Sequence, residues 1–336
     1  MAAIALIVWL VSWLSAPSFE IRDWQDLNAV RDNLRGHYIL MNDLDSTTAG
    51  YEELASPTAG WEPIGNHYMM FRGSFDGQGY EIRDLFIKRP AKYGVGLFGF
   101  VDEGGLIEDI GAVNVTVTGG NGVGGLVGVN YGIVSNSYST GSVSGIDLAV
   151  GGLVGFNRGT VSNSYSTVSV TGDEGVGGLV GVNSDDDYVS NSYFIGNVTG
   201  NDYVGGLVGT NRGAVRNSYS TGNVRGSRWV GGLVGDNFYT VSNSYSTGIV
   251  IGGEAVGGLV GRLYKGTVSD SFWDTETSGQ STSDGGTGKN TTEMKSIVTF
   301  SGIGWNIIAV APGSTNTTYI WNVVNNVTYP FLSWQS

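Results

Sequence analysis

One five-residue string, Gly-Gly-Leu-Val-Gly, recurs six times along this chain at a nearly constant spacing. The intervals between its copies are 27, 26, 28, 26 and 26 residues, and a degenerate copy precedes them at residues 95–99. A fixed period of roughly 20–50 residues is the signature of a repeat architecture, in which each unit buries its apolar face only by stacking on its neighbours. The repeat therefore predicts stacked units, with their leucines at Leu126, Leu153, Leu179, Leu207, Leu233 and Leu259.

The residues between these copies indicate β-structure. Short β-branched runs such as residues 160–165 alternate with glycines, and no apolar pattern with a helical period is present. A unit of this length is too short for a four-stranded propeller blade. We therefore predict an all-β parallel β-solenoid (a β-helix) with coils of about 26 residues that stack about 4.8 Å apart. The 42 glycines between residues 93 and 275, of 56 in the chain, are expected at corners and at close approaches of coils.

A second string, Asn-Ser-Tyr, keeps step with the first and ends as Asp-Ser-Phe at residues 270–272. Stacked coils place equivalent residues directly above one another, so we expect ladders of like side chains. A second amide column is expected through Asn130, Asn157, Asn183, Asn211 and Asn237. The structural ladders predicted from the Asn-Ser-Tyr string are an amide column, Asn136, Asn163, Asn191, Asn217 and Asn243, and an aromatic column, Tyr138, Tyr165, Tyr193, Tyr219 and Tyr245.

Residues 123–143 read Val-Gly-Gly-Leu-Val-Gly-x-Asn-x-Gly-x-Val-x-Asn-Ser-Tyr-Ser-Thr-Gly-x-Val. This pattern resembles the GLUG repeat of secreted bacterial and archaeal surface proteins, and the resemblance covers residues 93–275. The resemblance implies an adhesin-like β-solenoid at the cell surface. Some proteins of that kind are IgA-specific metallopeptidases, but their zinc signature His-Glu-x-x-His is absent from this sequence, so that activity is not carried over.

The flanks divide the chain further. Residues 1–17 form a signal-like or retained hydrophobic segment, which predicts a secreted or cell-surface protein. Residues 18–92, with an amphipathic helical pattern over 23–34, are expected to form a mixed N-terminal cap and the first coils. The repeat solenoid follows at 93–275, then a Ser/Thr/Gly-rich linker at 276–289. A small, β-rich, aromatic C-terminal cap is expected at 290–336.

Composition excludes several classes of function. The net charge of −13 is unsuited to nucleic acid, and the absence of cysteine excludes disulfides and thiolate chemistry. Contact with a membrane is expected only through the N-terminal segment, if it is retained. No metal or other cofactor is expected; a calcium ion at residues 185–187 is an open, weakly supported alternative because no calcium-loop spacing is present. A mainly acidic ridge five or six positions before the leucines from Leu153 onward is expected to be a solvated edge; its members are Asp147, Asp173, Glu174, Asp202, Arg228 and Glu254.

The position five residues after each repeat leucine carries exposed-type aromatic and basic side chains. Aromatic residues and arginines are enriched in interface cores, and they also stack on sugar rings. We therefore expect this column to bind a surface glycan, a protein or another copy of the chain. Its members are Tyr131, Arg158, Ser184, Arg212, Phe238 and Tyr264.

These observations favour a non-catalytic extracellular surface protein, an adhesion or structural module. An alternative is a self-assembling subunit of an extracellular filament or surface layer, and a remote one is a polysaccharide lyase or hydrolase. We expect no enzyme activity and name no catalytic residue. Asn-x-Ser/Thr sequons, which are glycosylation sites in exported chains, stand at Asn114, Asn197, Asn290, Asn316 and Asn326.

Overall fold

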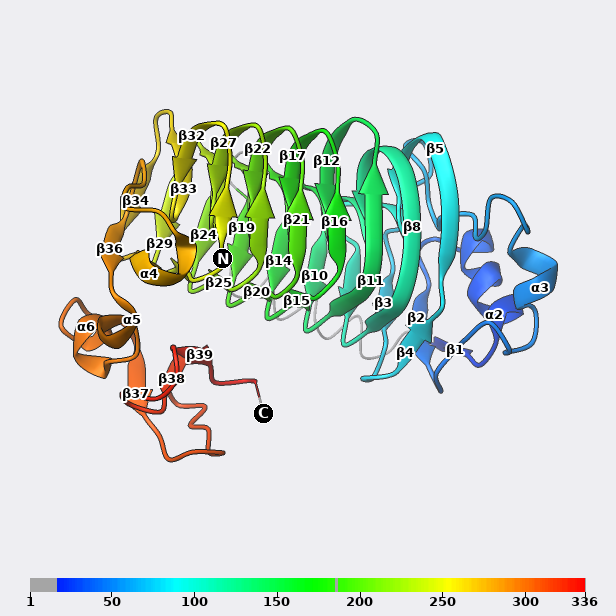
Figure 1. Ribbon diagram of the computed structural model, residues 1–336. Coiled ribbons are helices and arrows are strands. Elements are labelled where there is room, and N and C mark those ends of the chain that lie inside the picture. The colour runs from blue at the N-terminus through cyan, green and yellow to red at the C-terminus, as the bar shows by residue number, and fades with distance from the viewer. Residues whose placement is uncertain (1–16, 185–186, 336) are drawn as a thin grey trace, which may run out of the picture.

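The structure is a computed structural model that describes residues 17–184 and 187–335. The chain winds into a nearly all-β solenoid of about seven turns with about 27 residues each (Figure 1). The predicted parallel β-solenoid is therefore confirmed. The apolar run at residues 2–14 lies outside the described residues. No helix in the described part of the chain has the length and apolar character needed to cross a bilayer.

One face of the solenoid is a ten-stranded parallel sheet that runs its whole length. Equivalent residues pair in register, as Val134 does with Val161 and Val161 with Val189. Its strands are β1 (Ser18–Ile21), β2 (His37–Leu40), β3 (Ser74–Asp76), β7 (Leu106–Glu108), β10 (Ile133–Ser135), β14 (Thr160–Ser162), β19 (Tyr188–Ser190), β24 (Ala214–Arg216), β29 (Thr240–Ser242) and β34 (Thr267–Ser269).

A second face is a seven-stranded parallel sheet formed by the residues that follow each repeat leucine. This sheet carries the candidate site described below. Its strands are β6 (Phe98–Val101), β9 (Val127–Asn130), β13 (Val154–Asn157), β18 (Val180–Asn183), β23 (Val208–Asn211), β28 (Val234–Asn237) and β33 (Val260–Leu263).

The remaining strands close each coil between these two sheets. They are β4 (Glu81–Arg83), β5 (Phe86–Val95), β8 (Gly111–Gly124), β11 (Tyr138–Gly145), β12 (Leu148–Gly151), β15 (Tyr165–Ser166), β16 (Ser169–Thr171), β17 (Glu174–Gly177), β20 (Tyr193–Phe194), β21 (Asn197–Thr199), β22 (Asp202–Gly205), β25 (Tyr219–Ser220), β26 (Asn223–Arg225), β27 (Arg228–Gly231), β30 (Tyr245–Ser246), β31 (Val250–Ile251), β32 (Glu254–Gly257), β35 (Phe272–Asp274) and β36 (Thr287–Lys289).

The repeat leucines and valines fill the interior, and the paired glycines let the coils close around them. Leu207, for example, is fully buried. A Cβ at Gly205 would lie 1.9 Å from the carbonyl oxygen of Val208, and one at Gly206 would lie 2.1 Å from that of Gly232. Contacts this short exclude any side chain. Glycine is therefore required at these two positions because neighbouring backbone segments approach closely, and not because the backbone is left-handed.

The two asparagine columns have different roles. The side chains of Asn130, Asn157, Asn183, Asn211 and Asn237 are buried, and each Nδ2 donates to the Oδ1 of the next at 2.7–2.9 Å. This is a continuous amide ladder. It leaves each buried amide with a hydrogen-bond partner on the neighbouring coil, which offsets the cost of burying it.

The column that begins at Asn136 differs from the expected amide ladder. Its members have φ of 48° or 49°, and Asp84, Asp109 and Asp270 continue the column with φ of 47–58°. No hydrogen bond between successive side chains of this column is recorded in the described part of the chain. Asn and Asp tolerate the left-handed region better than other residues with a side chain, so this column turns the backbone at a corner instead of linking coils.

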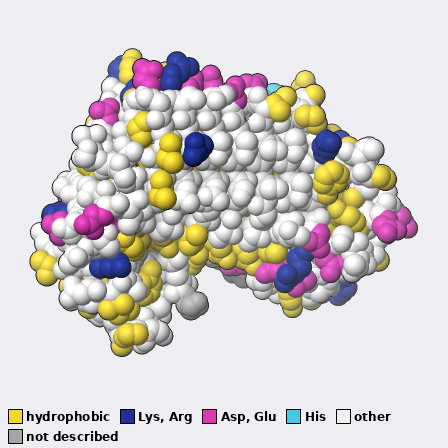
Figure 2. Space-filling model, in the orientation of Figure 1, with side chains coloured by type: hydrophobic (Ala, Val, Ile, Leu, Met, Phe, Trp, Pro, Cys, Tyr) yellow, Lys and Arg dark blue, Asp and Glu magenta, His cyan; other side chains and the backbone are white. Residues whose placement is uncertain are grey.

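The tyrosine column stacks. Successive rings from Tyr138 to Tyr245 have centroids 4.8–5.0 Å apart and interplanar angles of 0–6°. Burial raises the pKa of Tyr165 to about 12, with a further contribution from the neighbouring Tyr193. The stack forms an apolar strip along the outside of the solenoid. Figure 2 shows hydrophobic side chains gathered along the lower edge of the solenoid, above the C-terminal segment.

The N-terminal end is covered by α2 (Trp24–Ala29), the 3-10 turn Val30–Asp32 and α3 (Tyr51–Leu54). Asp23 caps α2 by accepting a hydrogen bond from the Asp26 amide at 2.9 Å. The buried side chains of Trp24, Leu27 and Val30 join the solenoid core. They shield the apolar interior of the first coil from water.

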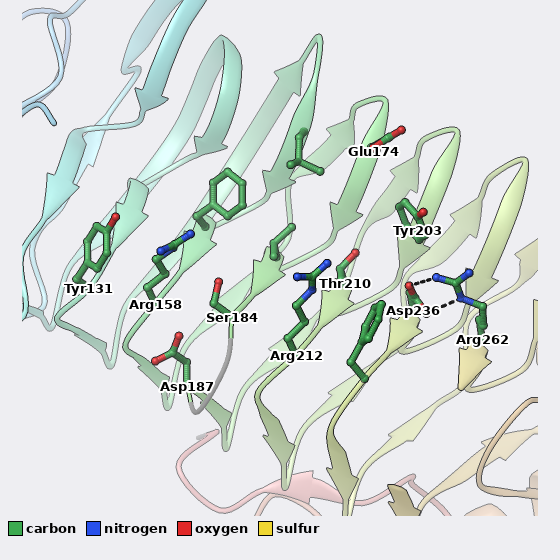
Figure 3. A pocket seen from close by; sticks show the side chains of 14 residues that line it. Tyr131, Arg158, Glu174, Ser184, Asp187, Tyr203, Thr210, Arg212, Asp236 and Arg262 are labelled. Carbon is green, nitrogen blue, oxygen red and sulfur yellow. Dashed lines mark hydrogen bonds and ion pairs between the residues drawn. The ribbon is translucent and has the colours of Figure 1, made fainter. Parts of the chain in front are cut away.

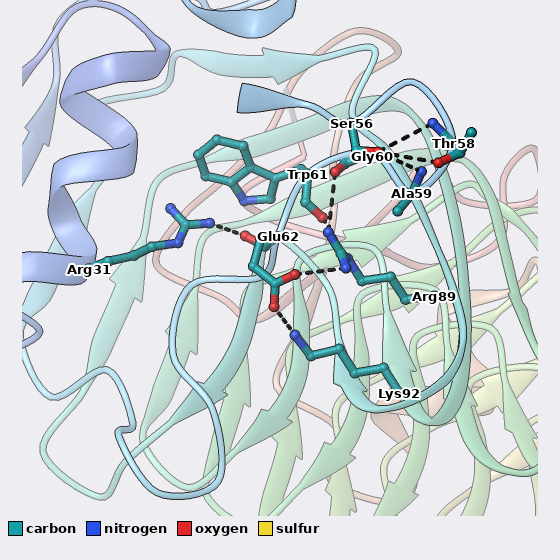
Figure 4. A network of polar contacts seen from close by, with 9 residues as sticks. All are labelled: Arg31, Ser56, Thr58, Ala59, Gly60, Trp61, Glu62, Arg89 and Lys92. Carbon is teal, nitrogen blue, oxygen red and sulfur yellow. Dashed lines mark hydrogen bonds and ion pairs between the residues drawn. The ribbon is translucent and has the colours of Figure 1, made fainter. Parts of the chain in front are cut away.

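A charged network joins this cap to β5 (Figure 4). Glu62 forms ion pairs with Arg89, at 2.8 Å, and with Lys92, while its carbonyl oxygen accepts a hydrogen bond from Arg31. The guanidinium of Arg31 also lies over the Trp61 ring at 4.3 Å. Burial lowers the pKa of Arg31 to about 10.

Residues 276–289, expected to be a linker, instead lie against the last coil. This segment begins inside α4 (Thr275–Ser278) and includes β36, which pairs with β35. The hydroxyl of Ser283 accepts a hydrogen bond from the amide of Val260 at 2.8 Å, and Gln280 donates to the carbonyl of Val250 at 2.8 Å. This segment therefore provides partners for backbone groups at the C-terminal end of the solenoid.

Residues 290–336 are expected to cap that end; the described part of this segment, 290–335, covers the side of the solenoid instead. It contains α5 (Thr291–Met294), α6 (Ile297–Ser301), β37 (Ile307–Ala309), β38 (Trp321–Val323) and β39 (Phe331–Leu332), and it returns beneath the coils (Figure 1). Trp321 packs against Tyr219 and Tyr245 within one buried aromatic cluster. The apolar strip of tyrosines explains this placement, because packing against it removes ring surface from water.

Candidate functional site

A groove of about 570 Å³ runs along the seven-stranded sheet, parallel to the solenoid axis (Figure 3). The third residue of each strand points outward and forms its floor. Along the stack these residues are Phe156, Val182, Thr210, Asp236 and Arg262. The floor thus changes from apolar to charged toward the C-terminal end.

One rim of the groove is the column expected from the sequence. Tyr131, Arg158, Ser184, Arg212 and Phe238 all line it. Tyr264 lies outside the lining, 55% exposed, with its ring centroid 5.0 Å from that of Phe238. The structure therefore brings five of the six expected residues together.

Two guanidinium groups on this rim each lie over an aromatic ring of a neighbouring coil. Arg158 lies over the ring of Tyr131 at 5.7 Å, and Arg212 lies over the ring of Phe238 at 4.9 Å. A guanidinium stacked on a ring keeps its N–H groups at its edge. Figure 3 shows both arginine side chains directed over the floor, and among the described residues neither is ion-paired with a carboxylate.

The opposite rim carries an aromatic residue that the sequence reasoning missed. Tyr203 lines the groove and stacks on Trp229, with centroids 4.6 Å apart and an interplanar angle of 7°. Both residues have a left-handed backbone, with φ of 56° and 54°. The same position on the other coils is occupied only by glycine or alanine: Gly94, Gly122, Ala149, Gly175 and Ala255.

This contrast is the signal that could have found Tyr203 and Trp229. A bulky aromatic in the left-handed region is strained, and such strain gathers at functional sites. In the sequence, two aromatics stand four residues before the leucine, where the other units have a small residue. The side chain at that position leans over the sheet, so these two aromatics create a rim that small residues would not.

An ion pair closes the C-terminal end of the groove. The carboxylate of Asp236, 1% exposed, accepts hydrogen bonds from Arg262 Nε at 2.8 Å and Nη2 at 2.5 Å. Hydrogen bonding to Asp236 raises the pKa of Arg262. The same guanidinium lies 4.3 Å from the Trp229 ring and 5.6 Å from that of Tyr203. These contacts give Asp236 a fixed structural partner.

Aromatic contacts limit the groove at its N-terminal end. Tyr93 packs edge-on against Phe156 at 6.2 Å and against Phe100 at 5.2 Å. His67 also packs edge-on against Phe100, at 5.8 Å. Burial raises the pKa of the Tyr93 phenol.

The acidic corner beside the groove is partly neutralised. Asp202 is ion-paired with Arg228 on the next coil, and Asp173 accepts a hydrogen bond from Asn201 at 2.5 Å. For the calcium alternative, residues 185 and 186 lie outside the described residues. Within 17–184 and 187–335, no group of three or more His, Asp or Glu side chains could hold a metal ion.

The sequons lie at the surface, apart from the groove. Asn290 caps α5 by accepting a hydrogen bond from Glu293 N at 2.9 Å, and Asn114 donates to Asp84 at 2.6 Å. Asn316 accepts from Thr318 N at 3.0 Å. The side chains of Asn197 and Asn326 are exposed.

Comparison with known proteins identifies the repeat. Residues 119–144, 147–171 and 200–225 each match the GLUG motif. Halomucin of Haloquadratum walsbyi is 37% identical over 133 residues, which cover 38% of this chain and 1% of Halomucin. A Gly-rich membrane protein of Evansella cellulosilytica is 38% identical over 114 residues, which cover 31% of this chain and 13% of that protein. The chain thus spans a small part of each relative.

The fold also has a counterpart among solved structures. An immunoglobulin A1 protease-like protein from Bacteroides ovatus superposes with a TM-score of 0.58 over 94% of this chain and 92% of its own, at 18% identity. At this identity the likeness shows the fold alone. Three units of this solenoid match the GLUG motif, and over about a third of its length the chain is similar to Halomucin and to the Gly-rich membrane protein.

Proposed function

We propose that this solenoid is a non-catalytic module of an extracellular surface protein and that it binds an extended ligand, a glycan or a protein, along the groove. The similarity to Halomucin and to a Gly-rich membrane protein supports a surface location. The solenoid supports the binding role because it repeats the same outward positions on successive coils, and solenoids present such extended surfaces to partners.

The observation that carries the proposal is the pair of ring-supported guanidinium groups on one rim, Arg158 over Tyr131 and Arg212 over Phe238. Stacking on Tyr131 and Phe238 holds Arg158 and Arg212 with their donors directed over the floor. An arginine oriented in advance loses less side-chain freedom when it binds. Arginine and aromatic side chains are also the types that dominate binding energies at interfaces.

The chemistry of the groove supports binding rather than cleavage. Glycoside hydrolysis requires two carboxyl groups, one to protonate the leaving oxygen and one to act as base or nucleophile. Both carboxylate oxygens of Asp236 accept hydrogen bonds from Arg262, so this carboxylate is not placed to act as an acid or a base. Glu174, the exposed carboxylate of the opposite rim, pairs in register with the aliphatic Leu148, and Asp187 lies across the groove from it, beside Ser184 (Figure 3).

A binding assay on whole cells tests this proposal. The full chain, fluorescently labelled, is applied to a panel of microbial and animal cells, beside the double variant R158Q/R212Q. We expect the double variant to lose most of its binding and to keep its unfolding temperature. Equal binding by both proteins, or release of reducing sugar from cell-wall polysaccharides by the purified chain, would contradict the proposal.

A further inference from the structure

We infer that the groove takes an uncharged, linear polysaccharide whose chain lies parallel to the solenoid axis. The inference rests on the proposed function, which leaves open whether the ligand is a glycan or a protein. Four observations favour this ligand: the direction of the groove, its balance of charge, its mixture of donors and acceptors, and one open aromatic face.

The direction of the groove favours a linear polymer. Tyr131 and Phe238 stand on its rim four coils apart, a span of about 19 Å at the usual spacing of parallel strands. Equivalent residues recur at each coil along this span. A pyranose in an extended β-linked chain advances by nearly the same length as one coil, so the groove accommodates about four sugar residues.

The charges of the groove favour a neutral ligand. Arg158, Arg212 and Arg262 balance Glu174, Asp187 and Asp236, three against three, in a chain whose net charge is −13. A site selected for an acidic polymer would show an excess of positive charge that draws the polymer in. The part of the lining that the structure describes provides no such excess, and the net negative charge of the chain repels an anion.

The hydrogen-bonding groups of the groove match hydroxyl groups. Arginine only donates and a carboxylate only accepts, whereas Ser184 and Thr210 do both. A sugar hydroxyl is likewise both donor and acceptor, so it can use each of these side chains. Between them, Phe156 and Val182 provide an apolar floor for the C–H groups of a sugar ring.

Within the column of residues four positions before the repeat leucines, only one face of the Tyr203 ring is covered by another ring. Trp229 covers that face. On the coil before Tyr203, the equivalent residue is Gly175, where a Cβ would come 3.0 Å from Val182 and 3.3 Å from Leu148. Gly175 therefore places no ring on the other face of Tyr203, and the apolar side chains of Val182 and Leu148 border it, so a sugar ring that stacks on Tyr203 would also contact them.

The strained backbone of Tyr203 provides a test that separates binding from stability. Glycine at this position adopts φ of 56° without strain, as it does at Gly175 and Gly122. If Tyr203 serves the ligand, Y203G keeps or raises the unfolding temperature while it weakens binding. A residue kept for stability would behave in the opposite way.

Affinity electrophoresis of the full chain provides the measurement. The gels contain neutral polysaccharides (mixed-linkage β-glucan, xylan or galactomannan) or acidic ones (alginate, polygalacturonate). We expect retardation by at least one neutral polysaccharide and by neither acidic one. Y203G and R158Q/R212Q are each expected to lower the affinity about tenfold or more, the loss typical of one or two good contacts. The control R225Q, an exposed arginine on β26 outside the groove lining, is expected to bind as the parent does.

The outcomes separate this inference from the proposed function. Stronger retardation by the acidic polysaccharides, or groove-dependent binding of an extracellular protein such as collagen in place of sugar, overturns the inference and leaves the proposed function standing. Binding to whole cells that R158Q/R212Q does not alter overturns both. For the neutral polymer, oligosaccharides of increasing length should gain affinity up to about four residues, the span of the groove.

Discussion

The indole Nε1 of Trp334 donates a hydrogen bond to the carbonyl oxygen of Asn191, 143 residues earlier in the chain, at 3.2 Å. The same indole stacks on Tyr193 with ring centroids 5.6 Å apart. Beside it, Gln335 donates to the hydroxyl of Tyr219 at 2.8 Å. The last described residues of the chain therefore hold the C-terminal segment against the tyrosine stack.

Replacing Trp334 is expected to loosen this attachment. W334A removes one hydrogen bond and the ring contact with Tyr193 and Tyr165, and we expect it to lower the free energy of unfolding by about 1–2 kcal/mol, less than for a fully buried tryptophan. Denaturant unfolding checks the value. W334F keeps a ring and should recover part of the loss, whereas equal loss in both variants would indicate that the stacking contributes nothing.

The stability of the protein should decline at alkaline pH. Burial and neighbouring rings raise the pKa of Tyr165 to about 12 from its ordinary value of 10.0, and burial raises that of Tyr219 as well. The folded state therefore keeps these protons while the unfolded state has already released them. The free energy of unfolding should be independent of these groups below pH 10 and fall as the pH rises from about 10 towards 12.

Two measurements check this dependence. Unfolding curves measured across the alkaline range give the slope of the free energy of unfolding against pH. The absorbance of phenolate gives the ionisation of the tyrosines in the folded state. Y165F preserves the ring in the stack and removes one titrating group, so its curve should fall less steeply. A parent curve that stays flat through this range would contradict the expectation.

The buried amide ladder should be sensitive to the loss of one member. N183A removes the acceptor of Asn157 Nδ2 and the donor to Asn211 Oδ1, and we expect a loss of roughly 2–4 kcal/mol because two buried polar groups lose partners. N223A is the matched control. Its amide bonds to Asn197 on the exposed surface, so its effect should stay within about 0.5 kcal/mol.

The column that begins at Asn136 should accept glycine without loss of stability, whereas a β-branched residue there should destabilise the protein. Asn163 has φ of 48°, so N163V should destabilise the protein by about 1–2 kcal/mol, whereas N163G should be close to neutral. Thermal unfolding of the two variants checks the order. If both lost the same stability, the side chain rather than the backbone angle would be the important feature.

The ion pair at the end of the groove should be replaceable as a unit. D236A leaves the Arg262 guanidinium without its carboxylate, and we expect a loss of about 2–3 kcal/mol, below the cost for a fully buried pair because Arg262 remains partly exposed. The double variant D236V/R262V should recover to within about 1 kcal/mol of the parent. Valine already occupies the same column at Val129 and Val182, so the backbone accepts it.

The sequence alone predicted one rim of the groove but not the other. Tyr131, Arg158, Arg212 and Phe238 were found because they recur at a fixed distance from the repeat leucine. Tyr203 also departs visibly from the small residues of the other units, but only the structure shows the left-handed backbone angle that makes a bulky side chain at this position unusual. The two asparagine columns illustrate the same limit: both recur with equal regularity, and only the backbone shows that the Asn130 column points inward while the Asn136 column turns a corner.

The period of the repeat by itself determined the solenoid, since each coil meets only its neighbours and the same local pairing is used at every step. It also determined which residues stack, as in the tyrosine column. Only the tertiary structure decided where residues 290–335 lie, because that segment has no repeat to place it and docks on an apolar strip that exists only once the coils have stacked. The groove arises in the same way: one rim comes from the position four residues before the repeat leucine, the floor from three residues after it and the other rim from five residues after it, and the folded coil brings all three to one face.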